Sequence, residues 1–252
     1  MEKKIDTSAL NALFISNSTM GQGPFKGDYL GHCLPELENF LKTHEISSVL
    51  FIPFAGVTVT WDAYKKKVAP IFEALGVSLT SIHDYETPGK MMKALQAAEC
   101  IVVGGGNTFN LFHQLYEKLI MEEIGLMVAE GTPFIGWSAG SNVACPSLRT
   151  TNDMPIVEPE SFSGLKSIPF QINPHFLDKN PDGHGGETRE NRIEEFIEVN
   201  PDIYVAGLRE GCMFLFTNGK MTYIGEHTCR IFKKGMEPIE LKGDKELQVL
   251  LG

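Results

Sequence analysis

The sequence predicts an α/β fold in which a mostly parallel central sheet is covered by helices on both faces, with an antiparallel portion near the C-terminus. Up to Ala144, short and continuously apolar runs alternate with segments of helical spacing, as in a sheet that is buried on both faces. After Gly211, apolar runs follow one another with only turns between them, and Asn218-Gly219 is a hairpin signal. No internal repeat or linker interrupts the 252 residues, so we expect a single domain over 1–252.

The first strands and helices follow from this alternation. The apolar runs predict strands over 12–16, 49–53, 77–82, 100–103 and 133–137. The segments between them carry apolar residues every three or four positions, which predicts helices over 29–42, 61–75, 88–98 and 111–130. Gly76 and Gly131 follow two of these helices, and we expect both to end them, because glycine readily adopts the left-handed conformation that closes a helix.

The second half of the chain has a different rhythm. A polar turn, a strand, a glycine-rich loop, a helix, a second strand and three antiparallel strands are expected, in that order, at 150–155, 168–172, 178–188, 189–199, 203–208, 212–217, 221–225 and 229–232. In open parallel sheets, functional sites form outside the carboxyl ends of the strands. Side chains that directly follow the predicted strands are therefore the candidates for chemistry.

The strongest candidate is Ser138, in the sequence Gly136-Trp-Ser-Ala-Gly140. Gly-x-Ser-x-Gly between a strand and a helix is typical of a nucleophile elbow, in which the serine occupies a strained turn and its hydroxyl stands clear of the sheet. Glycines suit the two outer positions because side chains there would collide. The amide of Ala139 then lies at a helix N-terminus, where it can donate to developing negative charge. The structural alternative is a plain tight turn between strand and helix.

A serine hydroxyl is a weak nucleophile and needs a base, which in turn needs a group that orients it. His175 is the candidate base because it directly follows an apolar strand. His184 is its rival, although a glycine-rich loop would hold a base poorly. Glu210, at the end of the next strand, is the candidate orienting acid, and Asp153 is the alternative acid.

The turn Gly104-Gly-Gly-Asn107 follows the strand over 100–103 and has two interpretations. It could cradle a phosphate, but its spacing is not that of a dinucleotide-binding motif and no acidic residue ends the next strand. Alternatively, Gly105 or Gly106 donates the second amide of an oxyanion hole, opposite Ala139. Glycine suits this role because the backbone must approach the substrate closely.

The composition argues against several classes of partner. The formal net charge is −10 and no long basic run is present, so we expect no nucleic acid and no anionic membrane surface as partner. No apolar run is long enough to span a membrane and no signal-peptide pattern is seen, so a cytoplasmic location is expected. The five cysteines are scattered and are expected to be reduced and buried. We expect no cofactor and no metal, since His175 and His184 lack the spacing of metal ligands.

Five motifs, in this order, resemble those of the peptidase E, or aspartyl dipeptidase, family, and the resemblance covers nearly the whole chain. They are Gly104-Gly-Gly-Asn-Thr-Phe109, Gly136-Trp-Ser-Ala-Gly-Ser-Asn142, Thr151-Asn-Asp-Met-Pro-Ile156, Asn173-Pro-His175 and Gly186-Glu-Thr-Arg-Glu190. The resemblance implies a flavodoxin-like, class I glutamine amidotransferase-like three-layer sandwich. It also implies removal of an N-terminal aspartate from dipeptides and some short peptides, without a metal.

The same resemblance implies roles for the candidate residues. The family's nucleophile falls on Ser138 and its histidine on His175. The third member of the family's triad falls on Glu210, and Asp153 is the acid sometimes considered in that role. The order Ser, His, Glu along the chain differs from the order Ser, Asp or Glu, His of the α/β-hydrolases.

Arg189 is the residue on which the resemblance places recognition of the aspartate side chain. A guanidinium binds a planar carboxylate through two parallel hydrogen bonds, and Arg189 would supply locally the positive charge that the chain as a whole lacks. Asn107, in the shared glycine-rich motif, is a second candidate for substrate binding. The glycine-rich loop before Arg189 could close over a small substrate. The expected partners are small acidic peptides, bound by a monomer or a homodimer.

Three other functions remain open at the level of sequence. A serine hydrolase of the cyanophycin-degrading kind would cut β-aspartyl bonds. A glutamine amidotransferase-like domain would carry a cysteine at the elbow, where this chain has Ser138. A non-enzymatic flavodoxin-like binding module would keep the fold but would not react with a serine-directed phosphonate.

Overall fold

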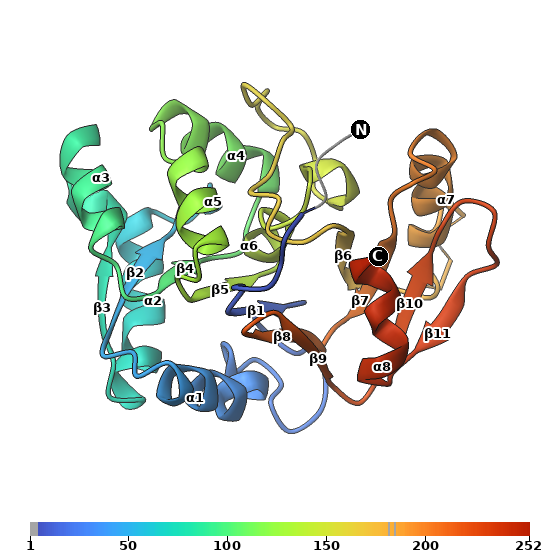
Figure 1. Ribbon diagram of the computed structural model, residues 1–252, viewed down its shortest axis with the longest axis horizontal. Coiled ribbons are helices and arrows are strands. Elements are labelled where there is room, and N and C mark those ends of the chain that lie inside the picture. The colour runs from blue at the N-terminus through green and yellow to red at the C-terminus, as the bar shows by residue number, and fades with distance from the viewer. Residues whose placement is uncertain (1–4, 181, 184) are drawn as a thin grey trace.

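The structure, a computed structural model, describes residues 5–180, 182–183 and 185–252, and its strands form two sheets (Figure 1). The larger sheet has the strand order β3-β2-β4-β5-β1-β8-β9, and the smaller sheet has the order β11-β10-β7-β6. The strands are β1 Ala12–Ile15, β2 Ser48–Ile52, β3 Ser78–Ser81, β4 Ile101–Val103, β5 Phe134–Trp137, β6 Gln171–Phe176, β7 Val205–Arg209, β8 Met213–Thr217, β9 Lys220–Ile224, β10 Cys229–Phe232 and β11 Ile239–Leu241. The α-helices are α1 Leu34–Thr43, α2 Trp61–Ala74, α3 Pro88–Gln96, α4 Thr108–Glu117, α5 Met121–Ala129, α6 Ala139–Asn142, α7 Arg189–Val199 and α8 Asp244–Leu247. Short 3-10 helices are η1 Gly31–Cys33, η2 Ile82–Asp84, η3 Leu148–Thr150 and η4 Gln248–Leu251.

The larger sheet confirms the predicted α/β class, with a parallel body and an antiparallel C-terminal portion. Strands β1 to β5 pair in parallel, and the β8–β9 hairpin joins the edge of β1 in antiparallel fashion. Strands β3 and β4 lie on opposite sides of β2, so the direction in which the chain adds strands reverses there. The carboxyl ends of strands at such a reversal form the crevice in which open α/β sheets place their sites.

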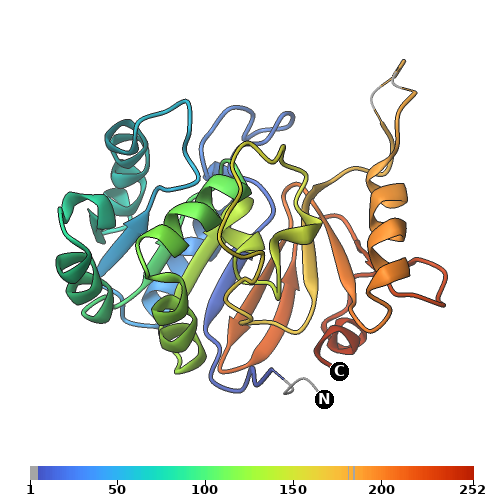
Figure 2. The same ribbon diagram turned by 90° about the horizontal axis from the view of Figure 1, so that it is seen from above.

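Helices cover both faces of this sheet, which produces three layers (Figures 1 and 2). Leu13 and Ile15 of β1 belong to the core shared with α1 and α2, whereas Ala12 and Phe14 belong to the core shared with α3, α4 and α5. Successive side chains of a strand point to opposite faces, so an apolar run without alternation is what a strand buried on both sides requires. The continuous apolar runs of the sequence have this physical cause.

The smaller sheet lies beside the β8–β9 edge of the larger one and carries α7 (Figure 1). Strands β6 and β7 are parallel, and β10 is antiparallel to both β7 and β11. Ile193 and Ile197 of α7 pack on this sheet against Phe176, Val205 and Phe232. The carboxyl ends of β6 and β7 therefore lie next to each other.

A cluster of charged side chains ties the loop between β6 and α7 to the smaller sheet. Arg209, at the end of β7, donates hydrogen bonds to Asp178 at 3.0 Å and to both carboxylate oxygens of Glu240 at 2.9 Å. Arg230 contacts Glu240 at 3.1 Å and Glu190, in the first turn of α7, at 2.6 Å. The hydrogen bonds from Arg209 hold the pKa of Glu240 at about 2. One end of the loop is thus fixed to β7 and the other to β10.

Three predicted elements differ from the structure. The helix predicted over 111–130 is wrong, because the chain turns at Leu119, where φ is 58° and the side chain is exposed, and two helices form instead. The strand predicted over 168–172 begins at Gln171 and continues through Phe176, because it pairs with β7 over that length. The helix predicted from residue 29 begins at Leu34, after a 3-10 turn.

Two properties predicted from composition can be compared with the structure. All five cysteines are buried and free, as predicted. Among the helices of the described residues, none combines the length and the apolar character that crossing a bilayer requires.

Candidate active site

Ser138 lies at the turn between β5 and α6 with φ 55° and ψ −114°, a left-handed conformation that is rare for a residue with a side chain. A Cβ on Gly136 would overlap the carbonyl of Gly140, and a Cβ on Gly140 would overlap the carbonyl of Val103. Ser141 stabilises the turn through its hydroxyl, which lies within hydrogen-bond distance of the carbonyl oxygens of Ile15, at 2.8 Å, and Gly136, at 2.9 Å. The strained turn is therefore fixed by its surroundings.

His175 and Glu210 complete a hydrogen-bonded chain with this serine. Nε2 of His175 lies 3.0 Å from Oγ of Ser138, and Nδ1 of His175 lies 2.8 Å from Oε1 of Glu210. Because a carboxylate only accepts, Nδ1 carries the proton in this contact and leaves Nε2 free to accept from the serine. His175 is the next-to-last residue of β6 and Glu210 follows β7, so the parallel pairing of these two strands brings the histidine and the acid together.

Ser16, at the end of β1, fixes the histidine from the larger sheet. Its hydroxyl donates to the carbonyl oxygen of Leu208 at 2.8 Å and accepts from the amide of His175 at 2.9 Å. His175 has φ 53° and lies at an irregularity in the β6–β7 ladder, which turns its ring toward Ser138. Asn17 accepts from the amide of Gly211 at 2.8 Å and so holds the turn that carries the acid. These two polar residues join the sheets at the site.

The electrostatic setting keeps the acid ionised. The hydrogen bond from His175 lowers the pKa of Glu210, although partial burial opposes this shift. His32 lies close enough to lower it further. A carboxylate that stays charged can stabilise an imidazolium on His175 when the histidine takes a proton.

Gly105 and Gly106, two of the predicted oxyanion donors, line the same cavity as Ser138, and the third, Ala139, directly follows the serine. Gly105 packs so closely that a Cβ there would lie 3.0 Å from Cβ of Ser138. Within residues 5–180, 182–183 and 185–252, the backbone amides of Gly105, Gly106 and Ala139 have no hydrogen-bond acceptor. The hydroxyl of Tyr64 donates to the carbonyl oxygen of Gly105 at 3.0 Å, which fixes the peptide group that bears the amide of Gly106. The three amides are thus free to bind a substrate oxygen.

Asp153 lies apart from His175. One of its oxygens accepts from the amide of Thr108 at 2.7 Å, from the hydroxyl of Thr108 at 2.6 Å and from the hydroxyl of Thr151 at 3.1 Å. It therefore stabilises the N-terminus of α4, where a negative charge is favourable. Of the two acids considered, Glu210 is the one hydrogen bonded to the histidine.

Asn107 caps the same helix, since its side-chain oxygen accepts from the amide of Asn110 at 3.0 Å. Its side-chain nitrogen donates to the carbonyl of Met154 at 2.9 Å. Asn107 lines the cavity at the site, but both of its side-chain polar atoms already have partners within the chain.

Ser138 and His175 open into a cavity of about 930 Å³, which Arg189, Asp153 and Lys67 also line. Among the described residues that line the cavity, Lys67 and Arg189 are the two with a lysine or arginine side chain. Arg189 is half-buried, and this burial, with the nearby Arg192, lowers the pKa of its guanidinium, whereas Asp153 raises it. Among the described residues, no carboxylate forms a salt bridge with Arg189. His184, the alternative base, lies outside the described residues.

Several residues that shape the site were missed at the level of sequence. Nε1 of Trp137 donates to the hydroxyls of Tyr29 and Tyr64, at 3.0 and 3.1 Å, and so supports the wall beside Gly105. Ser16 directly follows the first predicted strand, and the rule that sites form at the ends of strands could have indicated it. The tyrosines lie in a loop and a helix, and no local pattern marks them.

The sequence is similar to that of known peptidases over most of its length. The profile of "Peptidase family S51" matches residues 12–224. A protein named Peptidase E from Nostoc sp. is 46% identical over 240 residues, which is 95% of this chain and 96% of that protein. A Peptidase E from Shigella flexneri serotype 5b is 46% identical over 233 residues, which is 92% of this chain and 98% of that protein.

Solved structures show the same fold. A peptidase from an acI-B1 Actinobacterium superposes with a TM-score of 0.66 at 15% identity, over 93% of this chain and 94% of that chain. A putative peptidase E protein from Listeria monocytogenes EGD-e superposes with a TM-score of 0.55 at 23% identity, over 92% of this chain and 98% of that chain.

Proposed function

The chain belongs to peptidase family S51, and from this membership and the contacts at Ser138 we propose that it hydrolyses the peptide bond after an N-terminal aspartate in dipeptides and short peptides. It is a serine-type peptidase, and its substrates are peptides. One observation carries the proposal for the mechanism: Ser138, His175 and Glu210 form a continuous hydrogen-bonded chain that lines the cavity. This is the arrangement that activates a serine hydroxyl.

The proposed first step is attack of Oγ of Ser138 on the carbonyl carbon that follows the aspartate. His175 takes the hydroxyl proton on Nε2, and the charge of Glu210 stabilises the imidazolium that results. His175 then gives this proton to the leaving amine as the peptide bond breaks, which leaves an acyl-enzyme on Ser138. A water molecule, deprotonated by His175, hydrolyses the acyl-enzyme and restores the free serine.

The proposed oxyanion hole consists of the amide of Ala139 and that of Gly105 or Gly106. Gly105 packs against Ser138, Ala139 directly follows it, and these amides have no acceptor within the described chain. A donor that is already oriented needs no reorganisation when negative charge develops on the carbonyl oxygen. One such donor is worth about 3 kcal/mol in the transition state.

Arg189 is the proposed reader of the aspartate side chain. It lines the same cavity as Ser138 and has no salt-bridge partner among the described residues. Partial burial strengthens its interaction with a bound carboxylate, because less water competes for the guanidinium. The chain carries a net charge of −10, so attraction of an acidic peptide must come from such a local cation.

Arg189→Ala should lower the preference for an aspartyl substrate. Each hydrogen bond between charged groups contributes about 1.5–3 kcal/mol, so the ratio of kcat/KM for Asp-Leu over Asn-Leu should fall about 100-fold. Lys67→Ala is the matched control, because it removes the other cation that lines the cavity and should leave this ratio unchanged. Equal ratios in wild type and Arg189→Ala would refute the specificity role of Arg189.

A further inference from the structure

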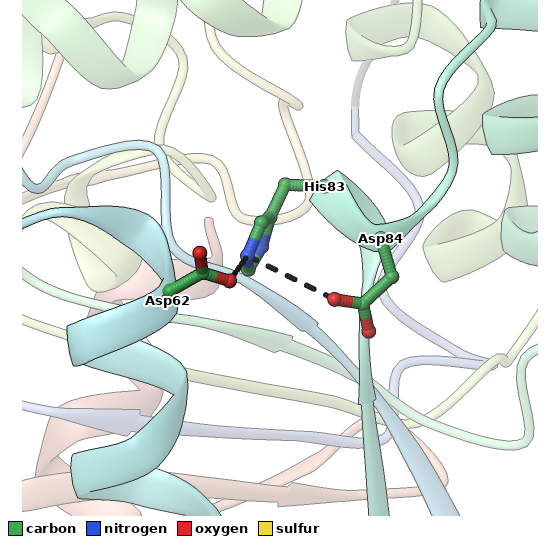
Figure 3. Close-up of side chains that lie close together, drawn as sticks. All are labelled: Asp62, His83 and Asp84. Carbon is green, nitrogen blue, oxygen red and sulfur yellow. Dashed lines mark hydrogen bonds and ion pairs between the residues drawn. The ribbon is translucent and has the colours of Figure 1, made fainter.

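A second group of polar side chains, Asp62, His83 and Asp84, lies at the start of helix α2 (Figure 3). Asp62 is in the first turn of α2, and His83 and Asp84 are in η2, directly after β3. Nε2 of His83 lies 3.1 Å from Oδ1 of Asp62 and 3.8 Å from Oδ1 of Asp84. One ligand atom from each of the three residues lies within 4.8 Å of the others. The start of α2 and η2, whose residues Asp62 and His83 are 21 positions apart, thus bring three potential ligands close together.

The hydrogen bonds of Ser81 determine which nitrogen of His83 faces the two carboxylates without a proton. Oγ of Ser81 donates its single hydrogen to the carbonyl oxygen of Phe51 at 3.1 Å, which can only accept. The contact of 2.6 Å between this Oγ and Nδ1 of His83 is then a hydrogen bond from Nδ1. In the neutral ring, Nε2 therefore presents a lone pair to carboxylate oxygens that are themselves acceptors. A proton on Nε2 or a metal ion between these atoms removes this repulsion.

This pattern is that of a metal-binding histidine. Such a histidine nearly always donates its second ring N–H to an oxygen, which fixes both the tautomer and the orientation of the ring. His83 is largely buried, with 11% of its side chain exposed, and it is held by Ser81. The hydrogen bond from His83 goes to Ser81, which is not one of the three potential ligands. It is therefore an observation separate from the proximity of those ligands.

The separations suit a small divalent ion. Metal–ligand bonds of 2.0–2.2 Å, at the angles of tetrahedral and octahedral ions, place neighbouring ligand atoms about 2.8–3.6 Å apart. The distance from Nε2 to Asp62 falls in this range, and the distance to Asp84 is slightly longer. A second cavity of about 470 Å³, which Asp62, His83, Asn110 and Gln114 line, lies beside the group. Water can fill the remaining coordination positions from this cavity.

Imidazole with two carboxylates is a donor set for a first-row divalent ion, and imidazole favours zinc over magnesium or calcium. Two carboxylates and a neutral imidazole bring a charge of −2 to the ion. Lys65 opposes binding, because its Nζ lies 2.6 Å from Oδ2 of Asp84. That contact uses the other oxygen of Asp84 and leaves Oδ1 available.

We propose that Asp62, His83 and Asp84 form a zinc site that joins the start of α2 to the end of β3. The cavity beside it shares Gly56, Val57 and Val59 with the cavity at Ser138, so the ion braces one wall of the substrate cavity. The ion does not take part in the reaction. Binding to the folded chain alone raises thermal stability.

The test uses the full chain without a histidine tag, treated with a chelator and then titrated with zinc chloride in a calorimeter. Wild type should bind one Zn²⁺ at this site and gain in Tm, and His83→Ala should weaken binding about 100-fold. Lys65→Met should tighten binding, because it removes the competing cation beside Asp84. His113→Ala is the matched control. His113 lies near one carboxylate only, that of Glu117 at 3.8 Å, so this variant should bind zinc as wild type does.

Far-UV circular dichroism confirms that each variant is folded before its affinity is compared. A wild type that binds no zinc, or a His83→Ala variant that binds zinc as tightly as wild type, overturns the proposal. Chelator-treated wild type should hydrolyse Asp-Leu at its full rate, and Ser138→Ala should bind zinc normally. Failure of the zinc site and failure of the proposed peptidase mechanism are therefore distinguishable.

Discussion

Ser138→Ala should lower kcat for Asp-Leu by about 10,000-fold to 1,000,000-fold, because removing the nucleophile of such a triad leaves only binding and oxyanion stabilisation. The change removes one oxygen from a half-buried side chain, so the fold should remain intact. The measurement is single-turnover hydrolysis of Asp-Leu, with Tm recorded for each variant.

The matched control for this serine is Thr58→Ala. Thr58 is an exposed residue that lines the same cavity, and loss of its hydroxyl should change kcat by less than about threefold. Hydrolysis by Ser138→Ala at a rate near that of wild type would show that another group attacks the substrate.

Glu210→Gln should lower kcat by about 10,000-fold, the loss seen when the orienting carboxylate of a serine triad becomes an amide. The carboxylate fixes the Nδ1–H tautomer of His175 through a contact of 2.8 Å and stabilises the imidazolium. An amide can donate to Nδ1 instead, which would place the proton on Nε2, where it opposes attack by the serine. The measurement is kcat for Asp-Leu over the neutral pH range.

Asp153→Asn separates the two acids that the sequence left open. Asp153 accepts three hydrogen bonds at the start of α4 and none from His175, so its loss should lower Tm while kcat stays within about tenfold of wild type. The reverse pattern, with a large loss of kcat in Asp153→Asn and a small one in Glu210→Gln, would move the orienting role to Asp153.

Much of the fold follows from local sequence. The apolar runs at 12–16, 49–53 and 133–137 are strands buried on both faces, and such strands need no alternation of polar and apolar residues. The helix over 189–199 begins and ends as predicted, and Thr188 caps its first turn. Local sequence predicts an element well where the pattern of buried residues and the capping residue indicate the same boundaries.

The break in the helix predicted over 111–130 could not be found in this way. Leu119 continues the helical spacing, yet it adopts a positive φ and lies exposed. Packing of α4 and α5 against the sheet sets this turn, and no glycine or proline marks it. Tertiary contacts override local preference at such positions.

The approach of Ser138 to His175 is also partly visible in the sequence. Both residues follow predicted strands, and the rule for strand ends brings them to one edge. The rule does not say that they lie in different sheets, or that Ser16 joins those sheets by holding the amide of His175. The convergence of Asp62 and His83 depends in the same way on how α2 packs beside β3, which no spacing in the chain reveals.

The most direct test of the central claim is labelling with a diphenyl phosphonate analogue of aspartate, followed by intact-mass and peptide-mass measurement. The account predicts one adduct per chain, on the peptide that contains Ser138, and slow labelling in His175→Ala because the base is missing. An adduct on another residue, or no adduct in a preparation that hydrolyses Asp-Leu, would contradict it.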